Sequence, residues 1–238
     1  MSFKKYNNWR EKLADPTSLE FTETMRGYFY NNEDQNTFSN INGEYKSSYE
    51  KGRTEKKQLD FTLTIKIKDM DSFCNDPQLQ AEALGDIECP QLGGTLRVNK
   101  GLFNLFVRPD SSTCMETAKE MHYLLQFKDS QGQDKTFYGF KSVEREDFTE
   151  MWPETTTLFI SVYPGILEQP PDKNDIPEKI GILNIEIKDF IKQLQSFKSS
   201  GRSLTERASA LSKFLSLFAG NLWEAYAPFI FGTDQDRW

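Results

Sequence analysis

The sequence predicts a mainly β protein of the α+β class: an antiparallel β-sandwich or open barrel followed by two C-terminal helices. Apolar and polar residues alternate with a period of two in one segment after another, which is typical of antiparallel strands with one face in the core. The strand segments come consecutively, and the longest helical periodicity follows them after residue 187. This order favours an antiparallel sheet over a βαβ arrangement.

The stretch Leu84 to Val107 is the expected centre of the sheet. It is predicted to contain a strand, a Gly-Gly turn, a second strand, a pivot at Gly101 and a third strand. The two-residue period places four residues on one face: Ile87, Cys89, Leu96 and Val98. The other strands are expected to pair with this stretch.

The first half of the chain contributes two predicted strands, residues 19–30 and 59–68. The second is the most regular in the sequence, and Leu63 and Ile65 are predicted core residues. The polar stretch 31–57 between the strands is expected to be a long loop or an irregular excursion with the weakest order in the chain.

Residues 1–18 are predicted to form an N-terminal arm, with apolar residues at helical spacing in residues 2–14. Residues 19–238 are predicted to form one β-rich domain that ends in a helical pair at 187–227.

The second half of the chain begins with a predicted hairpin at 121–143, with a glycine in its polar turn. Phe127 on its first strand is a predicted core residue. A strand at 155–163, a proline-containing connector at 166–179 and a last strand at 181–187 follow.

Apolar spacing predicts the first C-terminal helix from Ile187 to Phe197, and a capping box at Ser203 begins the second. The second helix has a stripe that is expected to dock on the body: Leu204, Ala208, Leu211, Leu215, Phe218 and Leu222. Additional apolar residues widen the stripe, so a homo-oligomer is one expected way to cover it.

Composition excludes several classes of protein. The net charge of −7 argues against a nucleic-acid partner, because neutralising phosphates needs a basic surface. Three scattered cysteines fit neither a disulfide framework nor a zinc site. No signal peptide and no transmembrane segment are expected, so a cytoplasmic location is predicted.

The sequence nominates no catalytic residue, no metal ligand and no cofactor. Its one histidine, His122, lies on the polar face of a predicted strand, and no Gly-x-Ser-x-Gly elbow or phosphate-binding glycine motif accompanies it. A solvated or hydrogen-bonded sheet histidine is the expected role.

Two further candidates have structural explanations that outweigh the functional ones. Asp69, Asp71 and Asp76 resemble a cluster for calcium, but capping by Asp71 or Ser72 and a turn at Asp76 are the stronger interpretation. Cys89 is predicted to be a core thiol.

Six aromatic residues could line a cavity or pack as core, and burial statistics favour core. They are Phe103, Phe106, Tyr123, Phe137, Phe140 and Phe159.

The order of the blocks FTETMRGYF, LTIKIKDMDSF, LGDIECPQLGGTLRVNKGLFNLF, MHYLLQFKDSQGQDKTFYGFKSV, TTTLFISVYPG and GILNIEIKDFIKQLQSF covers roughly residues 20–227. This order resembles the accessory region of bacterial multidomain proteins that also carry a glucose–methanol–choline (cholesterol-oxidase-like) oxidoreductase domain or an α/β-hydrolase domain. The catalytic motifs of those neighbouring domains have no counterpart here. The resemblance implies an association with sterol or lipid metabolism.

Three functions remain open at this stage. The first is a non-catalytic binding or interaction module for a hydrophobic small molecule or a partner enzyme. The second is an enzyme whose site uses carboxylates and tyrosines, which a buried cluster of acidic, tyrosine and lysine side chains with shifted pKa values would favour. The third is a structural domain that forms oligomers.

Overall fold

The computed structural model describes residues 16–32, 41–107, 119–143 and 157–219 of the 238-residue chain. In chain order, its elements are β1 (Ser18–Asn31), α1 (Ile41–Thr54), β2 (Gln58–Ile67), α2 (Met70–Asn75), β3 (Gln80–Cys89), the 3-10 turn η1 (Pro90–Leu92), β4 (Gly94–Val107), β5 (Lys119–Lys128), β6 (Asp134–Val143), β7 (Thr157–Pro164), β8 (Lys179–Asn184), α4 (Ile187–Gln195), β9 (Lys198–Ser200) and α5 (Leu204–Ala219).

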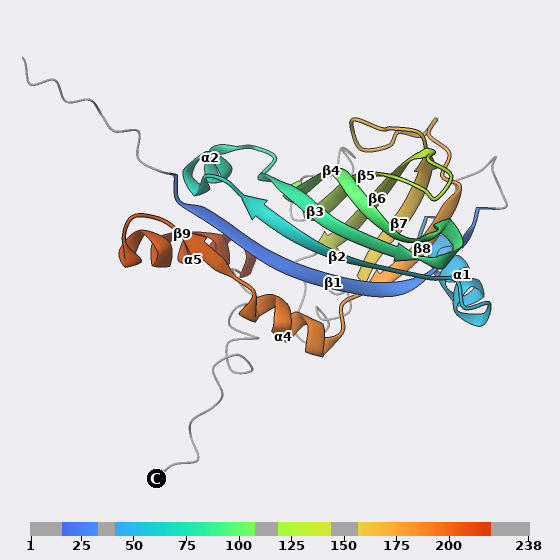
Figure 1. Cartoon of the computed structure of the whole chain (residues 1–238), viewed down its shortest axis with the longest axis horizontal. Coiled ribbons are helices and arrows are strands. Elements are labelled where there is room, and N and C mark those ends of the chain that lie inside the picture. The colour runs from blue at the N-terminus through green and yellow to red at the C-terminus, as the bar shows by residue number, and fades with distance from the viewer. Residues whose placement is uncertain (1–15, 33–40, 108–118, 144–156, 220–238) are drawn as a thin grey trace, which may run out of the picture.

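The sheet is a closed, antiparallel barrel (Figure 1). Strands β2 to β8 pair in chain order, and β1 closes the ring because it pairs with both β2 and β8. Strand β9 adds a short pairing to the start of β1. The prediction of a mainly antiparallel β protein is confirmed, whereas the sandwich alternative is wrong because one sheet closes on itself.

The barrel interior is filled by side chains that alternate inward along each strand, as the width of an eight-stranded barrel allows. The predicted core residues Leu63, Ile65 and Phe127 are fully buried. The predicted inward face of the central stretch is also confirmed, since all four of its residues are buried: Ile87, Cys89, Leu96 and Val98. Gly101 is not a pivot between two strands, because β4 runs through it without interruption.

Helix α1 corrects the prediction that residues 31–57 form an irregular loop. Its inner face has helical spacing, with Tyr45 and Ser48 buried. Tyr45 packs on the outside of the barrel against Phe140 and Phe159, with ring centroids 6.0 and 5.4 Å away. A side chain at Gly52 would place its Cβ 2.3 Å from the Phe29 carbonyl oxygen, so glycine allows the helix to approach β1.

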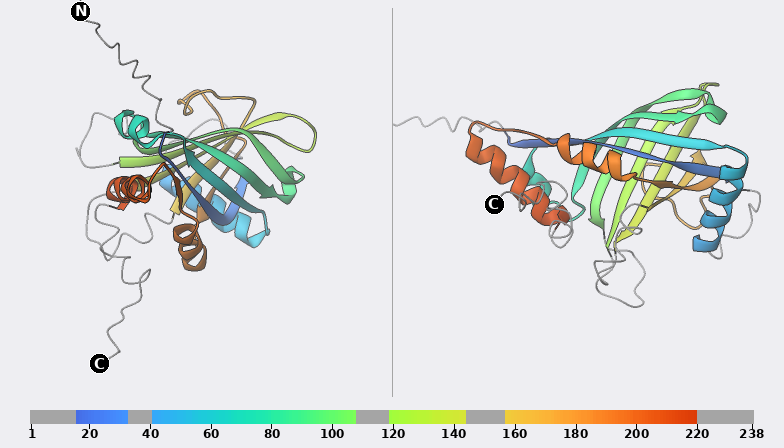
Figure 2. Two further views of the ribbon diagram at one scale, coloured as in Figure 1. Left: turned by 60° about the vertical axis from the view of Figure 1, so that its left-hand side comes forward. Right: turned by 90° about the horizontal axis from the view of Figure 1, so that it is seen from below.

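Helix α5 lies at the start of β1, at the opposite end of that strand from α1 (Figure 2). Its Phe214 is buried, with its ring centroid 5.4 Å from that of Phe21 and 5.6 Å from that of Phe197. The predicted docking stripe is wrong in part. Leu204 is 80% exposed, whereas Ala210 and Phe214 are the buried positions, so a neighbouring face of the helix contacts the barrel.

Helix α4 docks on the barrel through Phe190, which packs against the core, and through polar contacts with β1. The Arg26 guanidinium binds the Asp189 carboxylate, and Lys192 Nζ lies 3.1 Å from Asp189 Oδ1. The Ser196 hydroxyl accepts a hydrogen bond from the Thr22 amide at 2.7 Å. Among the described residues, no helix combines the length and the apolar character needed to cross a bilayer.

Several predictions lie wholly or partly outside the described residues. They concern the helix at 2–14 and most of the arm 1–18, the start of the strand at 155–163, and residues 220–227 of the helical pair. The side chains of Phe106, Ile187 and Phe218 are likewise outside the description, as is Leu222.

We expect Ile65→Ala to lower the free energy of unfolding by about 2–5 kcal/mol, because it leaves a cavity at a fully buried site. Urea denaturation measures the change. The control is Lys66→Ala, the adjacent exposed position, which should change stability by less than about 0.5 kcal/mol. Equal effects at the two positions would contradict the inward assignment of Ile65.

Asp189 is expected to make stability depend on pH. Burial alone would raise the pKa of Asp189, but hydrogen bonds from Lys192 and Arg26 outweigh burial and lower it. A lowered folded-state pKa stabilises the fold above the unfolded pKa of about 4, and this contribution is lost as pH falls through the folded-state pKa. At neutral pH, Asp189→Asn should therefore cost about 1.5–3 kcal/mol, as measured by urea denaturation.

The difference in unfolding free energy between wild type and Asp189→Asn should shrink in acid, below about pH 4. A difference that stays constant across this range would show that the Asp189 charge does not hold α4 on β1.

Candidate functional site

The hydrogen-bond ladder of the barrel wall breaks at one end. Pairing of β6 with β7 ends at Phe140, although β6 runs to Val143. Pairing of β1 with β8 begins only at Arg26, and β9 pairs with residues 18–20 of β1. Residues 141–143 of β6 therefore have no pairing with β7, and residues 21–25 of β1 have none with β8. We call the gap in the ladder between these two segments the notch.

Four polar side chains meet at the notch, inside the barrel: Glu23, Tyr123, Lys141 and Gln193. Each is at most 4% exposed. Lys141 Nζ lies 3.8 Å from Glu23 Oε2, and the Gln193 amide donates a hydrogen bond to the same oxygen at 3.3 Å. Lys141 Nζ also lies 5.5 Å from the centre of the Tyr123 ring. Two strands and α4 thus place a carboxylate, an amine and an amide together in the interior.

Strand alternation explains why these charged groups point inward. Glu23 lies between Phe21 and Met25 on the buried face of β1, and Lys141 shares the buried face of β6 with Phe137. Since the face of each strand is fixed by its apolar residues, the ionisable side chains on that face point inward as well.

Interlocking aromatic rings surround the cluster. The Tyr123 ring centroid lies 5.1 Å from that of Phe103 and 5.9 Å from that of Phe61, and Phe61 meets Phe137 edge to face. Of the six aromatic residues predicted to line a cavity or form core, Phe103, Tyr123 and Phe137 are therefore packed inside the barrel. Phe140 and Phe159 instead pack outside it, under α1.

Burial changes the acid–base properties of the cluster. Desolvation lowers the pKa of Lys141, and the Glu23 carboxylate opposes this shift only in part. The pKa of Tyr123 is raised well above its ordinary value, first by burial, then by the negative charge of Glu23 and by the interaction of the Tyr123 hydroxyl with that carboxylate. Lys141 therefore releases its proton more readily than an exposed lysine, while Tyr123 keeps its own.

One atom of the cluster is unsatisfied. Glu23 Oε1 is buried and accepts no hydrogen bond from any of the described residues. Most buried polar atoms in native structures have a partner, and leaving one unpaired costs about 1–3 kcal/mol. The notch thus holds a carboxylate oxygen that lacks a close donor among the described residues, beside the Lys141 amine and the Tyr123 hydroxyl.

Helix α4 completes the wall at the notch (Figures 1 and 2). At its C-terminal end, the Ser196 hydroxyl accepts a hydrogen bond from the Thr22 amide at 2.7 Å. The same hydroxyl donates to the Thr22 carbonyl oxygen at 3.2 Å. Because Thr22 and Glu23 are adjacent, Ser196 and Gln193 fix the backbone and the carboxylate of the same segment. The helix that fills the break in the ladder therefore also orients Glu23.

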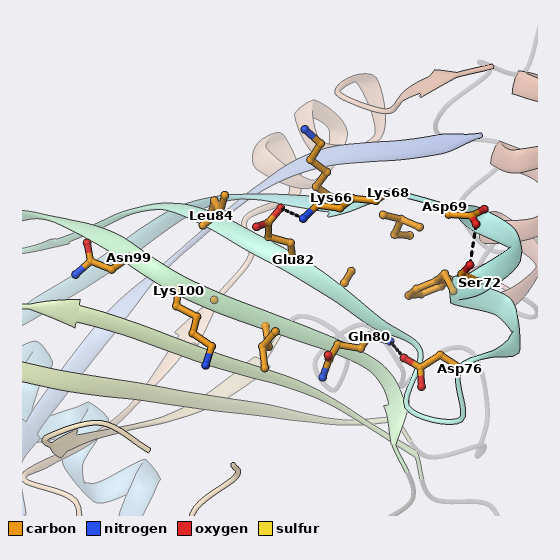
Figure 3. Close-up of a pocket in the computed structure, with 15 residues that line it drawn as sticks. Lys66, Lys68, Asp69, Ser72, Asp76, Gln80, Glu82, Leu84, Asn99 and Lys100 are labelled. Carbon is orange, nitrogen blue, oxygen red and sulfur yellow. Dashed lines mark hydrogen bonds and ion pairs between the residues drawn. The ribbon is translucent and has the colours of Figure 1, made fainter. Parts of the chain in front are cut away.

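A hollow lies on the outside of β2, β3 and β4 beside α2, away from the notch, with a volume of about 500 Å³ (Figure 3). Most of the charged groups around it are already paired. Lys68 Nζ lies 3.3 Å from Glu82, Lys100 binds Glu168, and the Gln80 amide donates to Asp76. This groove therefore offers a ligand fewer free polar groups than its composition suggests.

The three aspartates considered for calcium serve as caps and ion-pair partners. Asp69 is the N-cap of α2 and accepts from the Asp71 amide and the Ser72 hydroxyl, which corrects the prediction that Asp71 or Ser72 is the cap. Asp71 pairs with Lys213 at 2.6 Å, and Asp76 accepts amide hydrogen bonds in the following turn. Within the described part of the chain, no group of three or more His, Cys, Asp or Glu could hold a metal ion.

His122 and Cys89 have the structural surroundings expected of them. His122 Nε2 lies 2.7 Å from Glu120 Oε2 on the outer face of β5, and its ring meets Tyr138 edge to face. Cys89 is buried in the core, and burial raises the pKa of its thiol. Neither residue reaches the notch cluster.

The sequence prediction missed Glu23, Lys141 and Gln193 as site residues and named Tyr123 only as an aromatic. The sequence pattern indicates two of them. Glu23 lies on the same strand face as the apolar Phe21 and Met25, and Lys141 lies on the same face as Phe137. A charged residue on the apolar face of a predicted strand is a candidate for a buried charge. Gln193 could be found only from the way α4 folds back onto β1.

No protein-family model, no curated protein and no solved structure is similar enough to this chain to count as a match.

Proposed function

We propose that the chain is a non-catalytic binding module that holds a small, mostly apolar molecule at the notch through a hydroxyl head group. The observation that carries this proposal is the buried Glu23 Oε1, an ionisable acceptor with no donor among the described residues. A ligand hydroxyl would supply the missing donor, and hydrogen bonds to charged groups are worth about 1.5–3 kcal/mol.

The surroundings of Glu23 suit such a ligand. Gln193 and Lys141 engage Oε2, which leaves Oε1 for the ligand. The side chains next to the notch are apolar and aromatic, so moving a hydrocarbon skeleton from water into contact with them is favourable. Sites of this kind combine apolar walls with a few convergent polar groups that fix orientation.

The resemblance to the accessory region of cholesterol-oxidase-like and hydrolase-containing proteins supports the same ligand class. It implies an association with sterol or lipid metabolism, in which hydroxylated apolar molecules are abundant, and a partner enzyme is a further proposed ligand. The cytoplasmic location expected from the sequence is part of the same proposal. A homo-oligomer remains a prediction, for which the exposed Leu204 on α5 provides one apolar contact point.

An enzyme with a carboxylate and tyrosine site is the second candidate function. The observation that favours it is the buried Glu23–Tyr123–Lys141 cluster itself, in which burial shifts the pKa of Lys141 downward and that of Tyr123 upward. Clusters of this kind are enriched at catalytic sites, although structural ion pairs also produce them.

Titration calorimetry with 1-octanol and its methyl ether tests the binding proposal, because the ether has the same chain but cannot donate a hydrogen bond. We expect the alcohol to bind about tenfold or more tightly than the ether. Cholesterol and its methyl ether form a rigid pair for the same comparison. Glu23→Gln should abolish the preference, because the amide replaces one carboxylate oxygen with a donor.

Glu120→Gln is the matched control, since Glu120 bonds His122 on the outer face of the barrel. It should keep the alcohol preference, and circular dichroism would establish that both variants are folded. Equal affinity for alcohol and ether in the wild type, or a preference that survives Glu23→Gln, would refute the proposed role of Glu23.

A further inference from the structure

We propose that Lys141 captures an apolar aldehyde or ketone at the notch as an imine. This inference goes beyond non-covalent binding and rests on the proposed function for one point, that a small molecule reaches the notch. It is carried by the arrangement of three groups: the amine of Lys141, the vacant oxygen of Glu23, and the ring of Tyr123.

The amine of Lys141 is held loosely. Its one ion-pair contact within the described residues is the 3.8 Å approach to Glu23 Oε2, which is longer than a hydrogen bond. Lys135 provides a contrast on the same strand: it is also buried, but its Nζ lies 3.0 and 2.8 Å from the two oxygens of Glu178. Lys141 is therefore the buried lysine whose nitrogen is available for a new bond.

A lysine attacks a carbonyl only as the neutral amine. Desolvation favours that form and lowers the pKa of Lys141, and a lysine in an apolar enclosure is a known type of activated nucleophile. At neutral pH, the neutral fraction of Lys141 should thus exceed that of an ordinary exposed lysine.

Glu23 can carry the proton that the reaction moves. Glu23 Oε2, 3.8 Å from Nζ, accepts the ammonium proton when the amine attacks. The Nζ–carbon bond forms, the carbonyl π electrons move to oxygen, and a nitrogen proton is transferred through Glu23 to give the carbinolamine. The carbinolamine hydroxyl then leaves as water with the proton returned by Glu23, and the nitrogen lone pair forms the C=N bond. No oxidant or reductant is consumed.

The product fits the site as well as the reactants do. The protonated imine is a cation next to the Glu23 carboxylate, so the ion pair is preserved. The Tyr123 ring, 5.5 Å from Nζ, adds cation–π attraction. The carbinolamine hydroxyl is also the kind of donor that Glu23 Oε1 lacks.

The test is reductive trapping with octanal and sodium cyanoborohydride at neutral pH, followed by peptide mass mapping. We expect labelling of Lys141 to exceed that of exposed Lys66 about tenfold or more, with the excess lost as pH is lowered. Lys141→Met should lose this label, whereas Lys135→Met, the buried lysine at the other end of β6, should keep it. Glu23→Gln should slow labelling of Lys141 about 100-fold, because it removes the proton carrier.

Labelling of Lys141 no faster than that of Lys66, in a folded protein, would overturn the inference. The binding comparison separates this failure from failure of the proposed function: a retained preference for 1-octanol without trapping refutes imine capture alone, whereas loss of both refutes both. A rate unaffected by Glu23→Gln would overturn the assigned role of Glu23.

Discussion

Strand β1 pairs with β2 along nearly its whole length but with β8 only from Arg26 onward, and this unequal pairing shapes the rest of the molecule. The C-terminal half of β1 closes the barrel. The N-terminal half separates from β8 and leaves backbone groups that another element must satisfy. Ser196 of α4 and the short strand β9 do so, which is why the chain after β8 turns back along β1 rather than continuing away.

The same separation places the buried charges. Inward alternation puts Glu23 on the part of β1 that has no β8 partner and Lys141 just beyond the last pairing of β6 with β7. Removing two charges from water costs several kcal/mol each, and apolar residues of similar size often stabilise a core equally well or better. A loose 3.8 Å pair with a vacant carboxylate oxygen is therefore a poor device for stability, and its position in the wall favours a role in function.

The sequence predicted the strand faces and core residues, because these depend on residues that are close together in the chain. The alternation in β2 and β5 identified core residues such as Leu63 and Phe127, because a half-buried strand shows its inner face in its sequence. Helix α1 was missed because its buried face consists of Tyr45, Ser48 and a glycine rather than aliphatic residues. Barrel closure and the meeting of Glu23 with Lys141 join positions far apart in the chain, and alternation gives the face of a residue but not its neighbour across the barrel.

Helix α4 connects the stability of the wall to the state of the site. Asp189 holds the helix to Arg26 on the outside of β1, Ser196 satisfies the backbone of Thr22, and Gln193 reaches Glu23 in the interior. These contacts lie on one short helix, so a change in the charge or partners of Glu23 acts on the same element that completes the barrel. A ligand that occupies Glu23 Oε1 would leave the Gln193 bond to Oε2 intact, whereas a ligand that displaced Gln193 would also weaken the docking of α4. In the proposed function, the division of the two carboxylate oxygens between helix and ligand would therefore allow the notch to bind a molecule without opening the wall.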